Sequence, residues 1–260
     1  MSSTALKAFR LAEKLYFVGS EKVSVHLIKS DKGLILIDTG YPDMFEKIVQ
    51  NIGEVGFSVS DVTAIFHSHG HIDHFGCTRK LKELSGAKTY ISCEDNEIVN
   101  GTYDLSWAKE LGLEREEPFD CDVLIRDGDV FDFGDVAVRC VLTPGHTDGV
   151  LSFFITVQTA EGSYTAAMHG GMGMNSMRAD FLRQYGLSFD CRRKFAEGLR
   201  KVENEKVDLV LGNHPGQSGT LEKMNRLLDG EVSVLDATEW KTRIQAAEKN
   251  FEAFLLKDPE

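Results

Sequence analysis

Short apolar runs rich in β-branched residues alternate with amphipathic stretches along the chain, and Gly and Asp mostly separate them. Helices are predicted from Pro42 to Gly53, at 75–84, and at about 190–203, 219–228 and 238–256. The apolar runs predict strands at 23–28, 34–37, 62–66, 89–92, 136–142, 151–157, 164–168 and 207–211. Strands and helices follow one another in a similar order before and after about residue 120. This similarity predicts one α/β domain, 1–260, built from two pseudo-equivalent halves.

Two segments allow two interpretations each. The polar segment 100–120, with Tyr103 and Trp107 as its large side chains, is either a lid over a cleft or a surface connection. The predicted C-terminal helix, 238–256, has apolar side chains along one face. This apolar stripe packs on the protein's own sheet in one interpretation and forms a dimer face in the other. The stripe consists of Trp240, Ile244, Ala247, Phe251 and Phe254.

Composition narrows the classes of partner. With 42% hydrophobic and 27% charged residues, the chain has the profile of an ordinary globular protein. It carries 29 basic and 41 acidic residues, a net charge of −12, and no basic stripe, so nucleic acid is excluded and a small-molecule substrate is expected. No export signal or long apolar segment is visible, which predicts a cytoplasmic protein without a membrane partner. The five scattered cysteines indicate ordinary thiols, and the oligomeric state stays open.

Four of the eight histidines fall within residues 67–74, which indicates a metal site. His69 and His71 follow a predicted strand two residues apart, so their side chains point to the same side and can share one ion. Asp73 and His74 are adjacent, so the chain must turn between them for both to bind metal. A second ion close to the first is the natural result, as in dinuclear sites.

The remaining ligands are expected at later strand ends. His146 and His214 each follow an apolar strand, and each completes a set that is otherwise one ligand short. His169 is open between ligand, supporting partner and core residue, with the last two favoured. His67 is predicted to be a hydrogen-bond partner, and His26 has no functional assignment. The methionines of 168–177 either line an adaptable pocket or pack in the core.

Four motifs resemble those of the metallo-β-lactamase superfamily in order and spacing. They are Ile35–Gly40, Ser68–His74, Thr143–Thr147 and Asn213–Gly216. The closest similarity is to the B3 subclass, through the Ser-His-Gly-His-Ile-Asp-His run, the stretch 190–195, the His214-Pro215 pair and the Trp-containing C-terminal helix. The resemblance implies an αββα four-layer sandwich with the site at one edge of the paired sheets.

The resemblance also implies a division of the ligands between two zinc ions. One Zn²⁺ is expected on His69, His71 and His146, and the other on Asp73, His74 and His214. Asp38 is expected to support these ligands from a second layer rather than take part in the chemistry.

Two zinc ions imply metal-assisted hydrolysis. A metal-bound hydroxide is expected to attack an amide or ester carbonyl, with Asp73 orienting it as the catalytic residue. The expected substrate is a β-lactam or a lactone. The alternative is a cytosolic thioester or ester hydrolase of the glyoxalase II type, and an iron-dependent redox member is less favoured because no flavin-binding domain follows.

One departure from the superfamily pattern bears on the substrate. Gly170-Gly171 stands where many members have Gly-Asp with a metal-bridging carboxylate. B3 enzymes also lack this Asp but commonly carry a serine that helps orient the substrate. Gly171 has no side chain for that role, which weighs against β-lactam turnover more than against the metal site.

Overall fold

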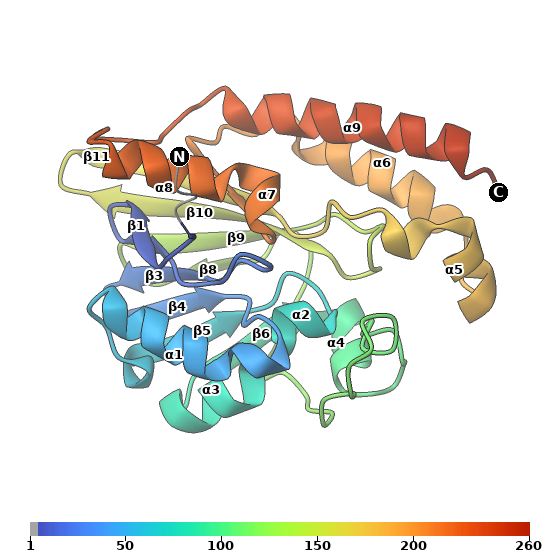
Figure 1. The fold of residues 1–260 in the computed structure, drawn as a ribbon, viewed down its shortest axis with the longest axis horizontal. Helices are drawn as coiled ribbons and strands as arrows, with labels where there is room; N and C mark the ends of the chain where they lie inside the picture. Colours follow the sequence, from blue (N-terminus) through green and yellow to red (C-terminus); the bar gives the residue numbers. More distant parts are fainter. Residues whose placement is uncertain (1–4) are drawn as a thin grey trace.

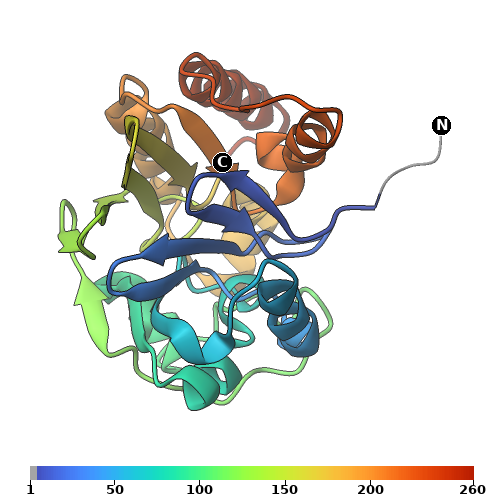
Figure 2. The ribbon, with the colours of Figure 1, turned by 90° about the vertical axis from the view of Figure 1, so that its left-hand side faces the viewer.

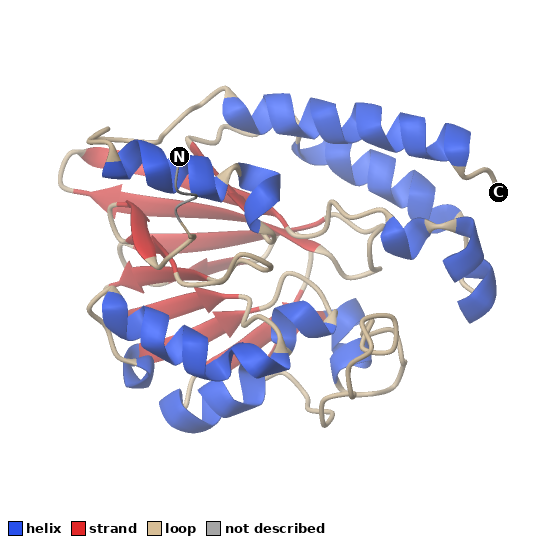
Figure 3. Ribbon diagram, in the orientation of Figure 1, coloured by secondary structure: helices blue, strands red, loops and turns tan. Residues whose placement is uncertain are grey.

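The computed structural model describes residues 5–260, which form two β-sheets stacked face to face between two layers of helices (Figures 1 and 3). The first sheet contains β1 (Phe9–Ala12), β2 (Leu15–Phe17), β3 (His26–Ser30), β4 (Gly33–Ile37), β5 (Val62–Phe66), β6 (Lys88–Ser92) and β7 (Val123–Ile125), in that order across the sheet. The second sheet contains, in spatial order, β12 (Leu209–Gly212), β11 (Gly162–His169), β10 (Leu151–Thr159), β9 (Val136–Leu142) and β8 (Val130–Asp132).

The helices divide between the two outer faces of the sandwich (Figure 2). On the side of the first sheet lie α1 (Phe45–Glu54), α2 (Ile72–Phe75), α3 (Thr78–Ser85) and α4 (Cys93–Val99). On the side of the second sheet lie α5 (Ala179–Tyr185), α6 (Asp190–Val202), α7 (Pro215–Ser218), α8 (Thr220–Leu228) and α9 (Glu239–Lys257). This arrangement confirms the predicted αββα sandwich, and each half of the chain supplies one sheet with its helices.

Strand direction brings the site residues to one edge of the sandwich. The strands β4 to β7 run parallel to one another, as do β11 and β12. Because parallel strands end at the same edge of a sheet, the loops that follow β4, β5 and β6 lie together. Asp38 directly follows β4, the histidine run follows β5, and Ser92 is the last residue of β6, before α4.

The core between the sheets is apolar and rich in aromatic side chains. Phe66 of β5 stacks on Tyr90 at 4.3 Å and meets Phe153 of β10 edge to face at 5.9 Å between ring centroids. The stripe of α9 packs on the second sheet, where Trp240 contacts Phe154 at 5.5 Å and donates its indole N–H to the carbonyl of Val202. The stripe therefore packs on the protein's own sheet, which is the first of the two interpretations given above.

The predicted strands are all present, with ends shifted by a few residues, and 62–66 and 136–142 have the predicted bounds. The predicted helix 75–84 is wrong in its bounds. Gly76 and Cys77 interrupt it, and a separate helical turn, α2, begins earlier at Ile72. Asp73 and His74 consequently lie on α2 rather than on the loop, and helical rotation supplies the turn between them that ligation by both requires.

Two further predictions concern side chains near the site. Met168 and Met177 are buried in the core, and Met172 and Met174 pack against the cluster under α6 and α9, which is the core-packing alternative. All five cysteines lie in the described part of the chain and are free thiols. Within residues 5–260 no helix is both long and apolar enough to cross a bilayer.

Candidate metal centre

Six predicted ligands converge at the edge where the strands of both sheets end. His69 and His71 lie on the loop after β5, and Asp73 and His74 on α2 directly behind it. The other two come from the second sheet: His146 follows β9, and His214 lies between β12 and α7.

These six residues form two groups of three, which we call the His triad and the Asp triad. The His triad is His69, His71 and His146, and the Asp triad is Asp73, His74 and His214. Within each triad, one ligand atom of every residue lies within 4.8 Å of the others. The structure therefore assembles the residues in the same two groups that the sequence resemblance implied.

Hydrogen bonds behind the His triad orient its rings. The Nδ1–H of His146 donates to the carbonyl of Gly173 at 2.8 Å, because a carbonyl can only accept. Ser68 donates its hydroxyl to Asp38 and therefore accepts from Nδ1 of His69, at 3.1 Å. These bonds leave the Nε2 lone pairs of both rings facing inward, where Nε2 of His69 lies 3.2 Å from Nδ1 of His71.

The Asp triad is oriented in the same way. His74 donates from Nδ1 to the buried carboxylate of Asp38 at 2.8 Å, and His214 donates from Nδ1 to the carbonyl of Lys22 at 2.8 Å. Their Nε2 atoms face one oxygen of Asp73, at 3.3 Å and 3.7 Å. Asp38 also accepts from the backbone N–H of Ser68, so it supports both triads, as predicted.

Burial and charge shift the pKa values of the His triad and of His74 in opposite directions, while burial lowers the pKa of His214 as it does those of the His triad. Burial lowers the pKa of His146 to about 4 and holds the pKa values of His69 and His71 well below the ordinary value, with the neighbouring histidines adding to the effect. Burial also opposes the charge of His74, but the carboxylates of Asp73 and Asp38 outweigh it and raise the pKa of His74 to about 10.

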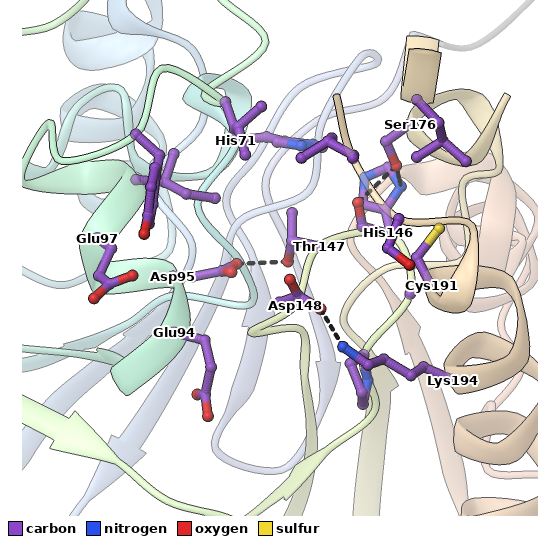
Figure 4. Close-up of a pocket in the computed structure, with 18 of the residues that line it drawn as sticks. His71, Glu94, Asp95, Glu97, His146, Thr147, Asp148, Ser176, Cys191 and Lys194 are labelled. Atoms are coloured by element: carbon purple, nitrogen blue, oxygen red, sulfur yellow. Dashed lines mark hydrogen bonds and ion pairs between the residues drawn. The ribbon is translucent and has the colours of Figure 1, made fainter. Parts of the chain in front are cut away.

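A buried carboxylate ties together the two loops that carry the His triad. Asp95 of α4 accepts hydrogen bonds from the backbone N–H of Gly70 at 2.7 Å and of Gly149 at 2.8 Å. It also accepts from the hydroxyl of Thr147 at 2.6 Å. Gly70 lies between His69 and His71, and Thr147 follows His146, so Asp95 fixes the distance between ligands from different sheets (Figure 4). Sequence reasoning missed this residue.

The remaining histidines lie outside the two triads. His67 is fully buried and bonds the carbonyl of Tyr90 at 2.9 Å and the hydroxyl of Thr78 at 2.7 Å, as its predicted role requires. His26 bonds the carbonyl of Gly212 at 3.1 Å. His169 is buried at the end of β11, where its Nδ1 accepts from the backbone N–H of Gly171 and its ring lies 6.2 Å from that of Phe195.

Packing explains the glycine at position 171. A Cβ atom there would lie 2.9 Å from Cγ2 of Val150 and 3.0 Å from Cβ of His146. Real Cβ atoms essentially never approach so closely, so a side chain at this position would displace His146 or Val150. A side chain at position 171 would therefore press against Val150 and against a predicted ligand, His146.

Two cavities adjoin the triads. The smaller, of about 160 Å³, is lined by Asp73, His74 and His214 together with Tyr41, Trp107 and Gln217, among others. The larger, of about 560 Å³, shares His71, His146 and Trp107 with it and extends between α4 and α6 (Figure 4). Tyr103 and Leu105 line the larger cavity and Leu111 the smaller, so part of the segment 100–120 forms a wall of the site, which favours the lid interpretation.

The donor set fits transition-metal binding. Five imidazoles and one carboxylate are the ligand types that zinc prefers, and the hydrogen bonds described above hold four of the rings with Nε2 free. Two donor triads joined through adjacent residues at the edge of an αββα sandwich are the arrangement expected of a metal-dependent hydrolase.

Comparison with known proteins gives the family. The model of the metallo-beta-lactamase superfamily matches residues 18–159, and the chain belongs to this superfamily. FEZ-1, a metallo-beta-lactamase from Legionella gormanii, is 25% identical with a TM-score of 0.87 over 99% of this chain and 98% of its own. BJP-1, a subclass B3 metallo-beta-lactamase of Bradyrhizobium japonicum, is 25% identical with a TM-score of 0.85 over 98% and 96% of the two chains. The predicted B3 resemblance and hydrolase class are confirmed at the level of the family.

Curated relatives match over shorter lengths. An uncharacterised protein of Aquifex aeolicus is 34% identical over 144 residues, which are 54% of this chain and 64% of the relative. A hydroxyacylglutathione hydrolase of Maricaulis maris is 30% identical over 113 residues, 44% of this chain and 34% of the relative. The chain thus aligns with less than two thirds of the length of these relatives.

Proposed function

We propose that this protein is a dinuclear zinc hydrolase that opens a cyclic amide or ester, with one Zn²⁺ on the His triad and one on the Asp triad. The observation that carries the proposal is the pair of adjacent triads, whose histidines are held with their free nitrogens facing inward. When bound, the ions supply a water that is ionised near neutral pH and positive charge for the oxygen of the attacked carbonyl.

The residues of the chain supply orientation and protection from bulk water. Asp73 keeps its negative charge because His74 and His214 lower the pKa of its carboxyl, although burial opposes them. Its Oδ2 lies 3.3 Å from Nε2 of His74, inside the Asp triad, and an ionised carboxylate at this point can accept a hydrogen bond from an attacking water and orient it. Trp107 and Leu111 line the cavity over this point and limit solvent access.

The substrate class follows from the B3 neighbours and from Gly171. Neighbours of the B3 subclass over nearly the full chain favour a strained cyclic carbonyl. Gly171 lacks a side chain that could orient a β-lactam, and a side chain there would press against Val150 and His146. Together these features favour a lactone over a β-lactam.

A second candidate is a thioester or ester hydrolase of the glyoxalase II type. Similarity to the hydroxyacylglutathione hydrolase of Maricaulis maris favours it. The same two triads would serve this reaction, so the substrate alone separates the two candidates.

Metal analysis followed by a substrate panel tests the proposal. Purified protein should carry two zinc ions per chain, and iron with a visible absorption band would contradict the assignment. The zinc protein should then be assayed with an acyl lactone, a chromogenic cephalosporin, an aryl ester and a glutathione thioester. Preferred turnover of the lactone is expected. Preference for the thioester would establish the second candidate, and inactivity toward all four would refute the hydrolase proposal.

A further inference from the structure

The larger cavity has a charge distribution that bears on its ligand. It opens from His71 and His146 and runs between α4 on one side and α6 on the other (Figure 4). Four carboxylates and one cation line it, namely Glu94, Asp95, Glu97, Asp148 and Lys194. The cation, Lys194, is paired with Asp148 at 2.8 Å, so its charge is already matched.

Glu94 and Glu97 leave negative charge at the cavity that nothing in the described structure neutralises. Both lie on α4 and are exposed, and neither forms an ion pair with any of residues 5–260. Asp95, between them, is buried and fully used by its three hydrogen bonds. The α4 wall of the cavity therefore presents two free carboxylates to whatever enters.

The rest of the wall is apolar and aromatic. It includes Ile98, Leu105, Trp107, Phe181 and Leu187. The Trp107 ring lies 5.6 Å from His71 and 5.3 Å from Phe181, so it bridges the metal centre and the cavity. Trp107 has a φ of +64°, a strained conformation for a bulky residue, and its buried indole N–H has no acceptor within the described residues. Strain and an unused donor at one residue indicate a position built for a ligand.

We propose that this cavity selects substrates by the group beside the scissile carbonyl. It accepts a largely apolar group that is either neutral or ends in a cation, and it rejects a group that bears a carboxylate. The aromatic faces and the free carboxylates of Glu94 and Glu97 both attract an ammonium group. A substrate carboxylate is repelled by these two glutamates and finds no unpaired lysine or arginine in the cavity wall. The inference rests on the proposed hydrolase function and narrows its substrate class, because it disfavours the glutathione moiety of glutathione thioesters, which carries two carboxylates.

Matched substrates test the selection. Three acylamino-lactones whose acyl chains end in trimethylammonium, methyl or carboxylate are assayed with the zinc-loaded protein. We expect kcat/KM for the carboxylate to be at least about tenfold below that of the other two. In Glu94→Gln/Glu97→Gln this difference should shrink to about twofold. The control Glu46→Gln/Glu83→Gln, which removes two exposed carboxylates from α1 and α3, should retain it.

A binding measurement separates the inference from the proposed function. Phenyltrimethylammonium should quench the fluorescence of Trp107 in the zinc-loaded protein, with Trp240 as a buried background, and the Glu94→Gln/Glu97→Gln variant should bind it at least about tenfold more weakly. Weakened ammonium binding in the variant, together with no turnover of any lactone by the wild type, refutes the lactonase proposal and supports the charge selection. Turnover with equal rates for the three lactones, or ammonium binding that is unchanged in the variant, overturns the inference alone.

Discussion

The two triads combine the same chemistry with different surroundings. The His triad is buried, with His146 only 9% exposed, and a carboxylate on α4 joins its two loops. The Asp triad includes His214, whose side chain is 37% exposed and is anchored by a single backbone carbonyl. Both triads are thus largely buried, but ties between loops hold the His triad together, whereas charge holds the Asp triad together.

This difference has a consequence for the whole fold. Each triad takes ligands from both sheets, because His146 and His214 follow strands of the second sheet while the other four follow a strand of the first. Ions on the triads would therefore join the two halves at one edge. Since the His triad has neutral imidazoles and the Asp triad an ion pair, we expect the two sites to differ in affinity and in their response to substitution.

Removal of the one carboxylate among the ligands should give the largest effect. Asp73→Asn should lower kcat by about a thousandfold or more, because the variant loses an anionic ligand and the group that orients the attacking water. Steady-state kinetics with the best substrate of the panel measures this. The exposed Asp61→Asn is the control and should keep full activity; comparable activity of the two variants would exclude a catalytic role for Asp73.

Chelation should separate the triads in order. The ion of the Asp triad is expected to leave first, with an affinity about tenfold lower, because His214 is accessible and weakly anchored. Titration with a chelator, with zinc release followed by a chromophoric indicator, should show two steps. In His214→Ala the early step should disappear, and loss of the late step instead would reverse the assignment.

The carboxylate between the loops should matter for one triad only. In Asp95→Asn an amide N–H₂ replaces one carboxylate oxygen and faces groups that are themselves hydrogen-bond donors. Because two donors cannot bond each other, we expect the loops that carry His71 and His146 to move apart. Zinc affinity of the His triad should fall about 10- to 100-fold, as for other groups that support metal ligands. Asp122→Asn is a matched control, because Asp122 accepts several hydrogen bonds remote from both triads, and it should leave zinc affinity unchanged.

The same carboxylate should make stability depend on pH. Burial raises the pKa of Asp95 from 3.8 to about 6, although Thr147, Gly70 and Gly149 oppose the shift. Because the pKa is higher in the folded state, the protonated form of Asp95 contributes to the free energy of unfolding. This contribution, about 3 kcal/mol, is complete below about pH 4 and is lost as the pH rises through 6. Denaturant unfolding from pH 4 to 7 should show this slope in the wild type and not in Asp95→Asn; equal slopes would contradict the shift.

The smallest expected effect concerns Gly171. Gly171→Ser should reduce stability by about 1–3 kcal/mol, because its Cβ meets Val150 and His146, and it should not create β-lactam turnover. Gly53→Ala on α1, where a Cβ meets nothing within 4 Å, should instead increase stability by about 0.5–1 kcal/mol. Thermal unfolding compares the two, and a neutral Gly171→Ser with cephalosporin turnover would refute the packing argument.

Much of the site was predictable because its ligands lie on consecutive, strongly patterned motifs. The strand 62–66 is a continuous apolar run that ends at the histidines, and spacing alone placed His69 and His71 on one side. Strands β1, β2, β7 and β8 were missed because their apolar runs are short and charged residues interrupt or flank them. Helix α4 was missed although Ser92, which caps its N-terminus by accepting from the N–H of Asp95, is a recognisable helix signal.

The tertiary contacts of the site were beyond prediction. Asp95 meets Gly70 and Thr147 across separations of 25 and 52 residues, which no local pattern encodes. The position of Lys194 opposite Glu94 likewise depends on how α6 packs against the site. The charge of the cavity wall depends on the same packing, because its carboxylates and its lysine come from different elements.

The central claim is that the two triads are separate metal sites. The most direct test is the metal content of the wild type and of two variants. The zinc-to-protein ratio should be two for the wild type and one for both His146→Ala and His214→Ala, since each variant loses one ligand of one triad. A ratio of two in either variant, or of one in the wild type, would contradict the account.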